Sequence, residues 1–167
     1  MIGSFLRSSK ASSLRDKGDA ARDRRDWKVA SHFYRQYLRH EPKSAEIWVQ
    51  YGHSLKESGE LGAAGLAYET ALSLEPRNFD THLQAGHLHK LRGDAAAAVE
   101  FYKSAVKLNP IHPDAMRELR NLGVSKQELA SIIDARIAEL EGQVFEMKQL
   151  RDEISKLEVD MSVMPTD

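Results

Sequence analysis

The chain of 167 residues contains no cysteine, so it can form neither a disulfide nor a thiolate metal site. It also lacks any apolar run that approaches the ~20 residues needed for a membrane-spanning helix. The first ten residues, MIGSFLRSSK, have too short an apolar part and no cleavage pattern for a secretory signal. These absences favour a cytoplasmic protein without a membrane span.

Recognisable catalytic motifs are absent as well, which predicts a chain that is not an enzyme and needs no cofactor. There is no glycine-rich phosphate loop, no nucleophile elbow and no supported acid-base pair. His82, His87 and His89 lie close together, but no carboxylate completes a metal-binding set at helical spacing, so no metal site is expected. His82 and His89 are instead predicted to fill core positions, with their ring nitrogens bonded to backbone or water.

The formal net charge is only −1, and the chain is basic at its start and acidic at its end. This asymmetry can steer a partner, although solvated helix faces explain it more simply. Arg22, Arg24 and Arg25 stand next to Trp27, a combination that can contact nucleic acid. Four aspartates interrupt the cluster and would repel phosphates, so no nucleic acid partner is expected. These aspartates are Asp16, Asp19, Asp23 and Asp26.

Only five prolines are present, and Pro42, Pro76 and Pro110 recur with a period of 34 residues. The same offset superimposes residues 45–78 on residues 79–112 with many identities. The identical pairs are Gln50/Gln84, Gly52/Gly86, His53/His87, Lys56/Lys90, Gly59/Gly93, Ala63/Ala97, Ala64/Ala98, Tyr68/Tyr102, Ala71/Ala105, Leu74/Leu108 and Pro76/Pro110. A fixed period of this length predicts a solenoid of stacked units.

Each unit is predicted to be a pair of short helices. Gly59 and Gly93 can end the first helix in a left-handed conformation, and each proline follows the second helix, where it stops further helical growth. Small residues at Gly52 and Ala64 are expected to face each other and to let the two helix backbones approach closely.

The central unit resembles the tetratricopeptide repeat (TPR) family. Trp48, Gly52, Ala64, Tyr68, Ala71 and Pro76 have the spacing of the family signature. The resemblance implies an all-α fold, a three-repeat TPR helical-hairpin solenoid with a capping helix. A long coiled-coil helix is expected to follow it, from the apolar spacing of the last segment. The first repeat has Arg25 where the others have an inter-helix glycine. The expected divisions are a flexible leader 1–10, a TPR domain 11–122 with repeats 11–44, 45–78 and 79–112 and cap helix 113–122, a coiled-coil helix 125–160 and a tail 161–167.

The last helix carries apolar residues at alternating spacings of four and three, the pattern of a coiled-coil seam with one irregular step after Met147. The seam residues are Ile133, Ile137, Leu140, Val144, Met147, Leu150, Ile154 and Leu157. β-branched residues alternating with leucine favour a parallel homodimer. A long helix folded back on a monomer remains the alternative.

Gln50, His53 and Lys56 match Gln84, His87 and Lys90, and TPR family geometry puts these positions on the concave face. Glutamine can pair with a peptide backbone, and the cations favour anionic groups. The row therefore predicts a groove for an extended protein or peptide ligand with acidic character. Duplication without any ligand is the alternative. The basic clamp that TPR chaperone-tail binders use is not matched, since Asp19, Asp80 and Gln84 stand at its positions.

Two further resemblances concern function. Gln50 and Gln84 resemble a longer-armed form of the Asn row in protein O-GlcNAc transferases. Three segments are similar to TPR regions that precede the catalytic part of bacterial glycosyltransferases. They are RDKGDAARDRRDW, IWVQYGHSLKESG and LQAGHLHKLRG. The leading interpretation is a non-catalytic interaction scaffold that self-associates. The alternatives are a substrate-docking and oligomerising glycosyltransferase segment and a structural self-assembly protein.

Overall fold

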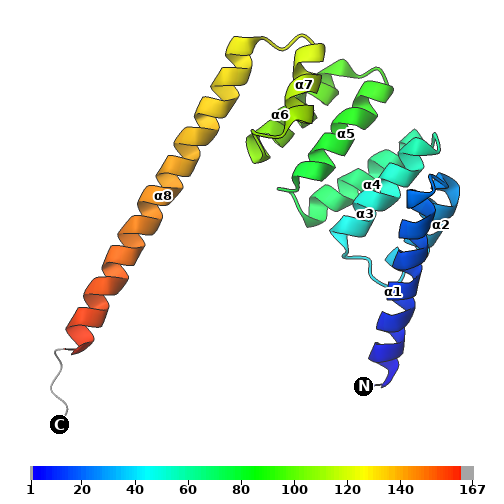
Figure 1. Cartoon of the computed structure of the whole chain (residues 1–167), viewed down its shortest axis with the longest axis horizontal. Coiled ribbons are helices and arrows are strands. Elements are labelled where there is room, and N and C mark those ends of the chain that lie inside the picture. The colour runs from blue at the N-terminus through cyan, green and yellow to red at the C-terminus, as the bar shows by residue number, and fades with distance from the viewer. Residues whose placement is uncertain (1, 163–167) are drawn as a thin grey trace. The chain divides into compact units, whose positions relative to one another are not determined.

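The computed structural model describes the backbone of residues 2–162 and the side chains of residues 11–155. This part of the chain consists of eight helices without a strand, which confirms the predicted all-α fold. They are α1 (Ile2–Asp23), α2 (Trp27–Leu38), α3 (Ala45–Glu57), α4 (Leu61–Leu74), α5 (Phe79–Leu91), α6 (Ala95–Leu108), α7 (Pro113–Asn121) and α8 (Lys126–Ser162). The chain divides into two units, Met1–Val124 and Ser125–Asp167. In the first, α1 to α6 pair as three stacked hairpins and α7 follows them (Figure 1).

Each hairpin is held together by a tyrosine ring that packs against a glycine of the facing helix. A Cβ added to Gly52 would lie 2.7 Å from Cε1 of Tyr68, and one added to Gly86 would lie 2.6 Å from Cε1 of Tyr102. The prediction that alanine faces Gly52 is corrected here, because the aromatic ring takes the space that the missing side chain leaves. All three tyrosines of this row are fully buried, Tyr34 among them.

The core runs continuously from one hairpin to the next. Ile47 of α3 packs with Ala30 and Tyr34 of the first hairpin, while Val49 and Leu55 of the same helix pack with Tyr68 and its neighbours. Trp48 and Tyr51 touch both groups. Burial is thus shared between neighbouring units, as expected for a solenoid whose single hairpins cannot bury their own apolar faces.

A ring nitrogen ties the linker prolines Pro42 and Pro76 to the first helix that follows each of them. Trp48 Nε1 donates to the Pro42 carbonyl at 2.8 Å, and His82 Nε2 lies 2.9 Å from the Pro76 carbonyl. A carbonyl only accepts, so Nε2 of His82 carries the proton. The expectation that His82 bonds to backbone is confirmed for this nitrogen. His82 therefore replaces the tryptophan of the central unit as donor, which explains why a polar ring occupies this position.

The N-terminal segment differs from the expected flexible leader, because α1 already begins at Ile2. Between Ser4 and Lys17 no proline or glycine interrupts the backbone, so the helix that carries the first tyrosine-packing glycine, Gly18, can extend in the N-terminal direction. Residues 2–10 are described by their backbone only.

After the third hairpin the predicted cap and helix start are present. Pro113 is the first residue of α7, and Gly123 has φ 86°. Ser125 Oγ accepts a hydrogen bond from the backbone N–H of Glu128 at 3.2 Å and so caps the start of the next helix. Helix α8 then runs for 37 residues. No helix in the described part of the chain is both long and apolar enough to cross a bilayer.

The turn of the first hairpin stores strain that glycine would relieve. Arg25 adopts φ 59°, whereas the equivalent turns have Gly59 at φ 87° and Gly93 at φ 78°. A left-handed conformation costs an L-residue about 1–2 kcal/mol, which exceeds the extra entropy that glycine loses on folding. Arg25→Gly should therefore raise the free energy of unfolding by about 0.5–1 kcal/mol in urea denaturation. The reverse change, Gly59→Arg, should lower it, and effects of the same sign in both variants would contradict the strain argument.

Candidate functional site

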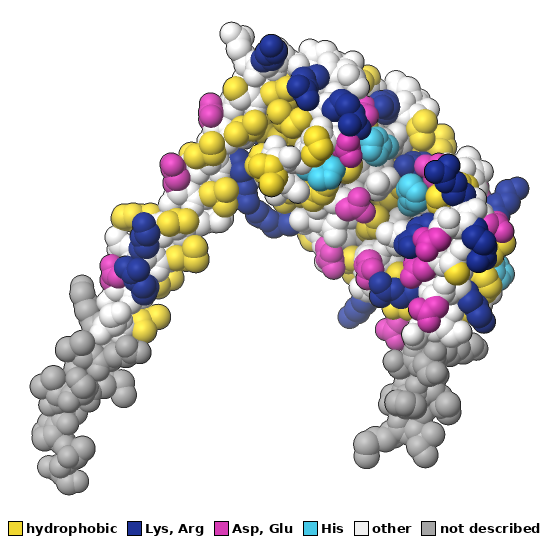
Figure 2. All heavy atoms as spheres, in the orientation of Figure 1, with side chains coloured by type: hydrophobic (Ala, Val, Ile, Leu, Met, Phe, Trp, Pro, Cys, Tyr) yellow, Lys and Arg dark blue, Asp and Glu magenta, His cyan; other side chains and the backbone are white. Residues whose placement is uncertain are grey.

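The six predicted groove residues lie on α3 and α5, the first helices of the second and third hairpins. They repeat at a spacing of three within each helix, which keeps them near one face. Gln50, His53 and Gln84 come together around a hollow of about 220 Å³, whose wall is completed by Arg22, Val49 and Asp80. We call this surface the inter-repeat hollow. Figure 2 shows that side chains of both charges are interspersed over the viewed face of the solenoid.

A ladder of polar bonds connects the first helices of successive units. Arg22 Nη1 donates to Gln50 Oε1 at 3.2 Å, and Lys56 Nζ donates to Gln84 Oε1 at 3.0 Å. The third rung is the 2.6 Å ion pair between Lys90 Nζ and Glu118 Oε2. Each rung spans 28 residues, so its donor and its acceptor each recur at the repeat period.

The ladder fixes the orientation of both glutamine amides. Ammonium and guanidinium groups only donate, so the atoms of Gln50 and Gln84 that face Arg22 and Lys56 must be the oxygens. Within the described residues, neither Nε2 donates to a protein acceptor. Two amide N–H₂ groups at equivalent positions are therefore available to a ligand.

Lys56 is not a surface residue, which corrects the prediction that it offers a free cation to the groove. Its side chain is 6% exposed and lies 3.3 Å from a carboxylate oxygen of Glu57, in addition to the bond with Gln84. The repeat pattern alone could not reveal this, because the acceptor belongs to the next unit. Lys56 supports the stack and orients Gln84 rather than facing solvent.

His53 is arranged as a neutral ring between two units. Its Nδ1 lies 3.4 Å from Gln84 Oε1, and the ring meets that of Trp27 edge-on at 5.3 Å. Burial lowers the pKa of His53, and the positive charge of Lys56 lowers it further. With Nδ1 facing an acceptor oxygen, the neutral ring leaves Nε2 as a hydrogen-bond acceptor.

His87 and Lys90 do not line the inter-repeat hollow. Nδ1 of His87 lies 2.8 Å from the hydroxyl of Tyr102, and burial followed by the charge of Lys56 lowers the pKa of His87. Lys90 keeps 42% of its side chain exposed, but Glu118 holds its ammonium. These two residues belong to the α5–α7 end of the same face.

Arg22, Asp80 and Glu118 also belong to this face, although none of them was among the predicted groove residues. The repeat offset could have found two of them, because it carries Lys56 back onto Arg22 and Gln84 forward onto Glu118. Asp80 gives no such signal, since the matching residue of the preceding unit is Glu46, which pairs with Arg15 at 2.6 Å. Asp80 itself is exposed and forms no hydrogen bond or ion pair with another described residue.

Among the described residues, no three His, Asp or Glu side chains gather in a way that could hold a metal ion. His89 instead stacks on Phe101 with ring centroids 5.0 Å apart, and its Nδ1 lies 3.4 Å from Asp94. Asp94 in addition caps α6, Glu118 holds Lys90, and His87 faces the hydroxyl of Tyr102.

The profile of the family described as "Tetratricopeptide repeat" matches residues 45–78 and 79–112. These two segments are tetratricopeptide repeats. They comprise α3 to α6, with the boundaries predicted from the proline period. The TPR signature residues Gly52 and Tyr68 are the pair that closes the second hairpin.

Solved TPR structures share this fold over most of the chain. The Arabidopsis OM64 TPR domain is 18% identical, with a TM-score of 0.67, and the match covers 70% of this chain and 97% of that domain. The first TPR of Spaghetti (RPAP3), bound to the HSP90 peptide SRMEEVD, is 20% identical with a TM-score of 0.66, covering 74% and 95%. The second TPR domain of human RPAP3, in complex with the HSP70 peptide SGPTIEEVD, is 16% identical with a TM-score of 0.65, covering 70% and 97%.

No curated protein matches this sequence. The comparisons support the TPR resemblance and give no support to the one with TPR regions of bacterial glycosyltransferases. At these low identities the solved structures show the fold alone.

Proposed function

We propose that this chain is a non-catalytic protein-interaction scaffold that binds an extended protein or peptide segment across the first helices of its TPR units. The observation that carries the proposal is the pair of anchored amides. Lys56 and Arg22 hold the oxygens of Gln84 and Gln50, so the N–H₂ groups can donate to carbonyl oxygens of an extended backbone. Peptide binding by the solved TPR domains of RPAP3 is consistent with this role.

Lys56 and Lys90 were expected to contact acidic groups of the ligand, and of these two lysines only Lys90 is accessible. Its side chain is partly exposed at the α5–α7 end of the face, whereas Lys56 is buried. Glu118 already neutralises Lys90, so an acidic ligand group would have to share that ammonium. Whether the peptides that bind this chain contain acidic residues therefore tests the expected ligand charge directly.

The binding test uses an array of random nine-residue peptides probed with the full chain, followed by fluorescence anisotropy on the peptides that bind. Gln50→Met removes the amide while keeping the length of the side chain, and it leaves Arg22 paired with Asp19 and Asp23. We expect affinity to fall about fivefold to tenfold, the cost of one or two lost hydrogen bonds.

Gln36→Met is the matched control, because Gln36 lies on α2, a second helix away from the row. It should leave affinity unchanged, and both variants should unfold at nearly the parent midpoint. If no peptide binds, or if the selected peptides bind both variants equally, the first-helix face is not the binding site.

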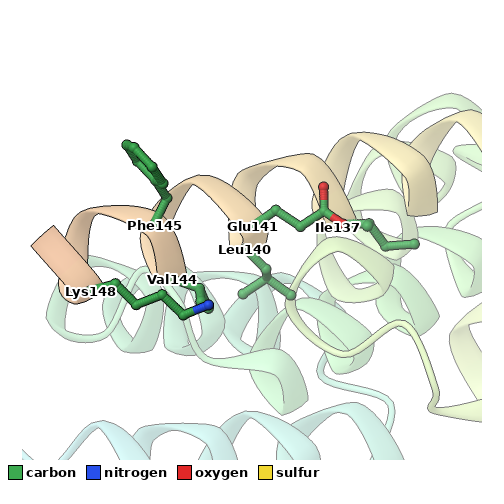
Figure 3. Close-up of a pocket in the computed structure, with 6 residues that line it drawn as sticks. All are labelled: Ile137, Leu140, Glu141, Val144, Phe145 and Lys148. Atoms are coloured by element: carbon green, nitrogen blue, oxygen red, sulfur yellow. The ribbon is translucent and has the colours of Figure 1, made fainter.

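The second part of the proposal is self-association through α8. Apolar side chains of the predicted seam are strongly exposed on this helix, between 41% for Leu140 and 61% for Met147. Figure 3 shows Ile137, Leu140 and Val144 on successive turns, with Glu141 and Lys148 beside them. Ile133 is half-buried, and the side chain of Leu157 lies outside the described residues. Phe145, 63% exposed, is an additional apolar residue that the seam spacing did not identify.

A second copy of this chain is the occupant that the seam favours. In a parallel pair Arg136 would meet Glu141 and Glu146 would meet Arg151, although Glu153 opposite Glu158 is unfavourable. Within one helix Arg136 already pairs with Glu139, at 2.7 Å. A coiled coil would thus bury the apolar row and leave charged residues along its edges.

Light scattering should therefore give twice the 18.8 kDa chain mass at tens of micromolar. Leu140→Glu combined with Val144→Glu should yield monomers, because two carboxylates would be buried in the seam. A chain ending at Gly123 should also be monomeric. Leu91→Glu, at a position 59% exposed on α5, is the matched control and should remain dimeric. A full-length monomer would contradict the proposal, and growth beyond a dimer would favour the self-assembly alternative.

A further inference from the structure

Tyr34, Tyr68 and Tyr102 are equivalent residues of the three hairpins, but the hydroxyl of Tyr68 lacks the partner that the other two have. The hydroxyl of Tyr34 donates to Asp19 at 2.7 Å, and that of Tyr102 lies 2.8 Å from His87. Both partners occupy the same position of a first helix. The equivalent residue in the central unit is His53, but its Nδ1 faces Gln84 instead. The hydroxyl of Tyr68 is consequently buried without a hydrogen-bond partner among the described residues.

This hydroxyl is buried behind the inter-repeat hollow, whose lining does not include Tyr68. The ring of Tyr68 passes directly over Gly52, the neighbour of His53 on α3. The repeated geometry of Tyr34 and Tyr102 places such a hydroxyl beside the residue that follows the glycine. In this unit that residue is His53, which lines the hollow. Burial raises the pKa of Tyr68, and the negative charge of Asp80 raises it further, as expected for a carboxylate near this ring.

One carboxylate on the wall of the hollow has no cationic partner among the described residues. Arg22 is neutralised by Asp19 at 3.1 Å and Asp23 at 3.0 Å, and the ammonium of Lys56 lies beside Glu57. Asp80, on the wall of the hollow, has no cationic partner in the described part of the chain. The acceptors that remain on the lining are the carboxylate of Asp80 and Nε2 of His53.

We propose that the inter-repeat hollow binds a basic side chain, a lysine ammonium or an arginine guanidinium, of the extended segment that crosses the first helices. The guest would donate to Asp80 and His53, while the amides of Gln50 and Gln84 hold the backbone that carries it. A hollow of about 220 Å³ accommodates the end of one side chain and is smaller than a site for a drug-sized molecule, about 300–1,000 Å³. This inference rests on the proposed peptide-binding function and names the chemistry of one ligand residue.

The test uses single blocked amino acids as probes on the full chain. Nα-acetyl-lysine methylamide and its arginine counterpart are titrated while the backbone amide resonances of His53, Asp80 and Gln84 are followed by NMR. The norleucine derivative supplies the apolar stem without charge, and the glutamate derivative supplies the opposite charge. We expect saturable shifts with at least one basic probe, and at least about fivefold weaker binding of norleucine and glutamate, equivalent to about 1 kcal/mol.

Asp80→Asn should weaken binding of the basic probe about fivefold without changing the size of the side chain. Asp134→Asn, the same change on α8, is the matched control and should have no effect. The inference is overturned if neither basic probe gives saturable shifts, if norleucine or glutamate binds as tightly, or if Asp80→Asn leaves affinity unchanged. The proposed peptide-binding function is tested separately by the peptide array. Peptides whose binding is weakened by Gln50→Met would still support that function in each of these cases. An array in which no peptide binds would contradict the function itself.

Discussion

Replacing Gly52 with leucine is expected to lower the free energy of unfolding by about 3 kcal/mol, because the new side chain must displace a buried aromatic ring. A Cβ alone would lie 2.7 Å from Cε1 and 2.9 Å from Cδ1 of Tyr68. Tyr68 is only 1% exposed, so the ring cannot swing into solvent without opening the core shared with the next hairpin. Either the ring or the α3 backbone must move, and both movements lose contacts across the hairpin.

Gly62→Leu provides the matched control for this experiment. Gly62 lies in the first turn of α4, and no heavy atom lies within 4 Å of a Cβ built there. The substitution should leave stability unchanged or raise it slightly, since leucine has the better helix propensity. Urea denaturation followed by circular dichroism measures both variants. Equal midpoints for Gly52→Leu and Gly62→Leu would show that the glycine and tyrosine contact does not limit the approach of the two helices.

The second large effect is expected for Lys56→Glu, which should cost about 3 kcal/mol or more. The replacement puts a carboxylate where an ammonium now donates to Gln84 Oε1 at 3.0 Å and lies 3.3 Å from Glu57. An acceptor would then face an acceptor, and two negative charges would be close together at a position with little access to solvent. The bond between the second and third hairpins is lost at the same time.

Lys43→Glu is the control, since Lys43 is exposed in the linker before α3 and its charge reversal should change stability by less than about 0.5 kcal/mol. Thermal unfolding of the two variants and the parent decides the question. Similar melting temperatures for all three would mean that Lys56 is not part of the stack. A loss of stability would also mean that charge reversal at Lys56 cannot serve as a clean test of ligand binding.

The local features of the fold could be predicted from the sequence because they depend on residues close together in the chain. Gly59 and Gly93 end first helices in the left-handed conformation, and Pro76 and Pro110 follow second helices. The contacts inside a hairpin were less predictable. The positions of Gly52 and Tyr68 were recognised, but the contact between them depends on how the two helices are rotated about their axes, which periodicity does not specify.

The candidate site was predictable only in part, for a related reason. The periodicity placed Gln50, His53 and Gln84 near one another, and the structure brings them together. It gave no indication that Lys56 would turn away from solvent, because burial of that residue depends on the distance between successive units. Identical residues at equivalent positions therefore have different surroundings: Tyr68 and Tyr102 match in sequence, yet only Tyr102 has a partner for its hydroxyl.

The polar ladder favours changes in length by whole repeat units. Each rung pairs a donor in one unit with an acceptor 28 residues later, so insertion or deletion of one or two residues within α5 before Gln84 would move the acceptor to another face of its helix. A whole additional unit of 34 residues, copied from residues 45–78, would bring its own donor and acceptor in register. Such an insertion would satisfy the ammonium of the preceding unit and present a new one to the unit that follows. The solenoid can therefore lengthen by complete repeats without leaving a buried charge unpaired.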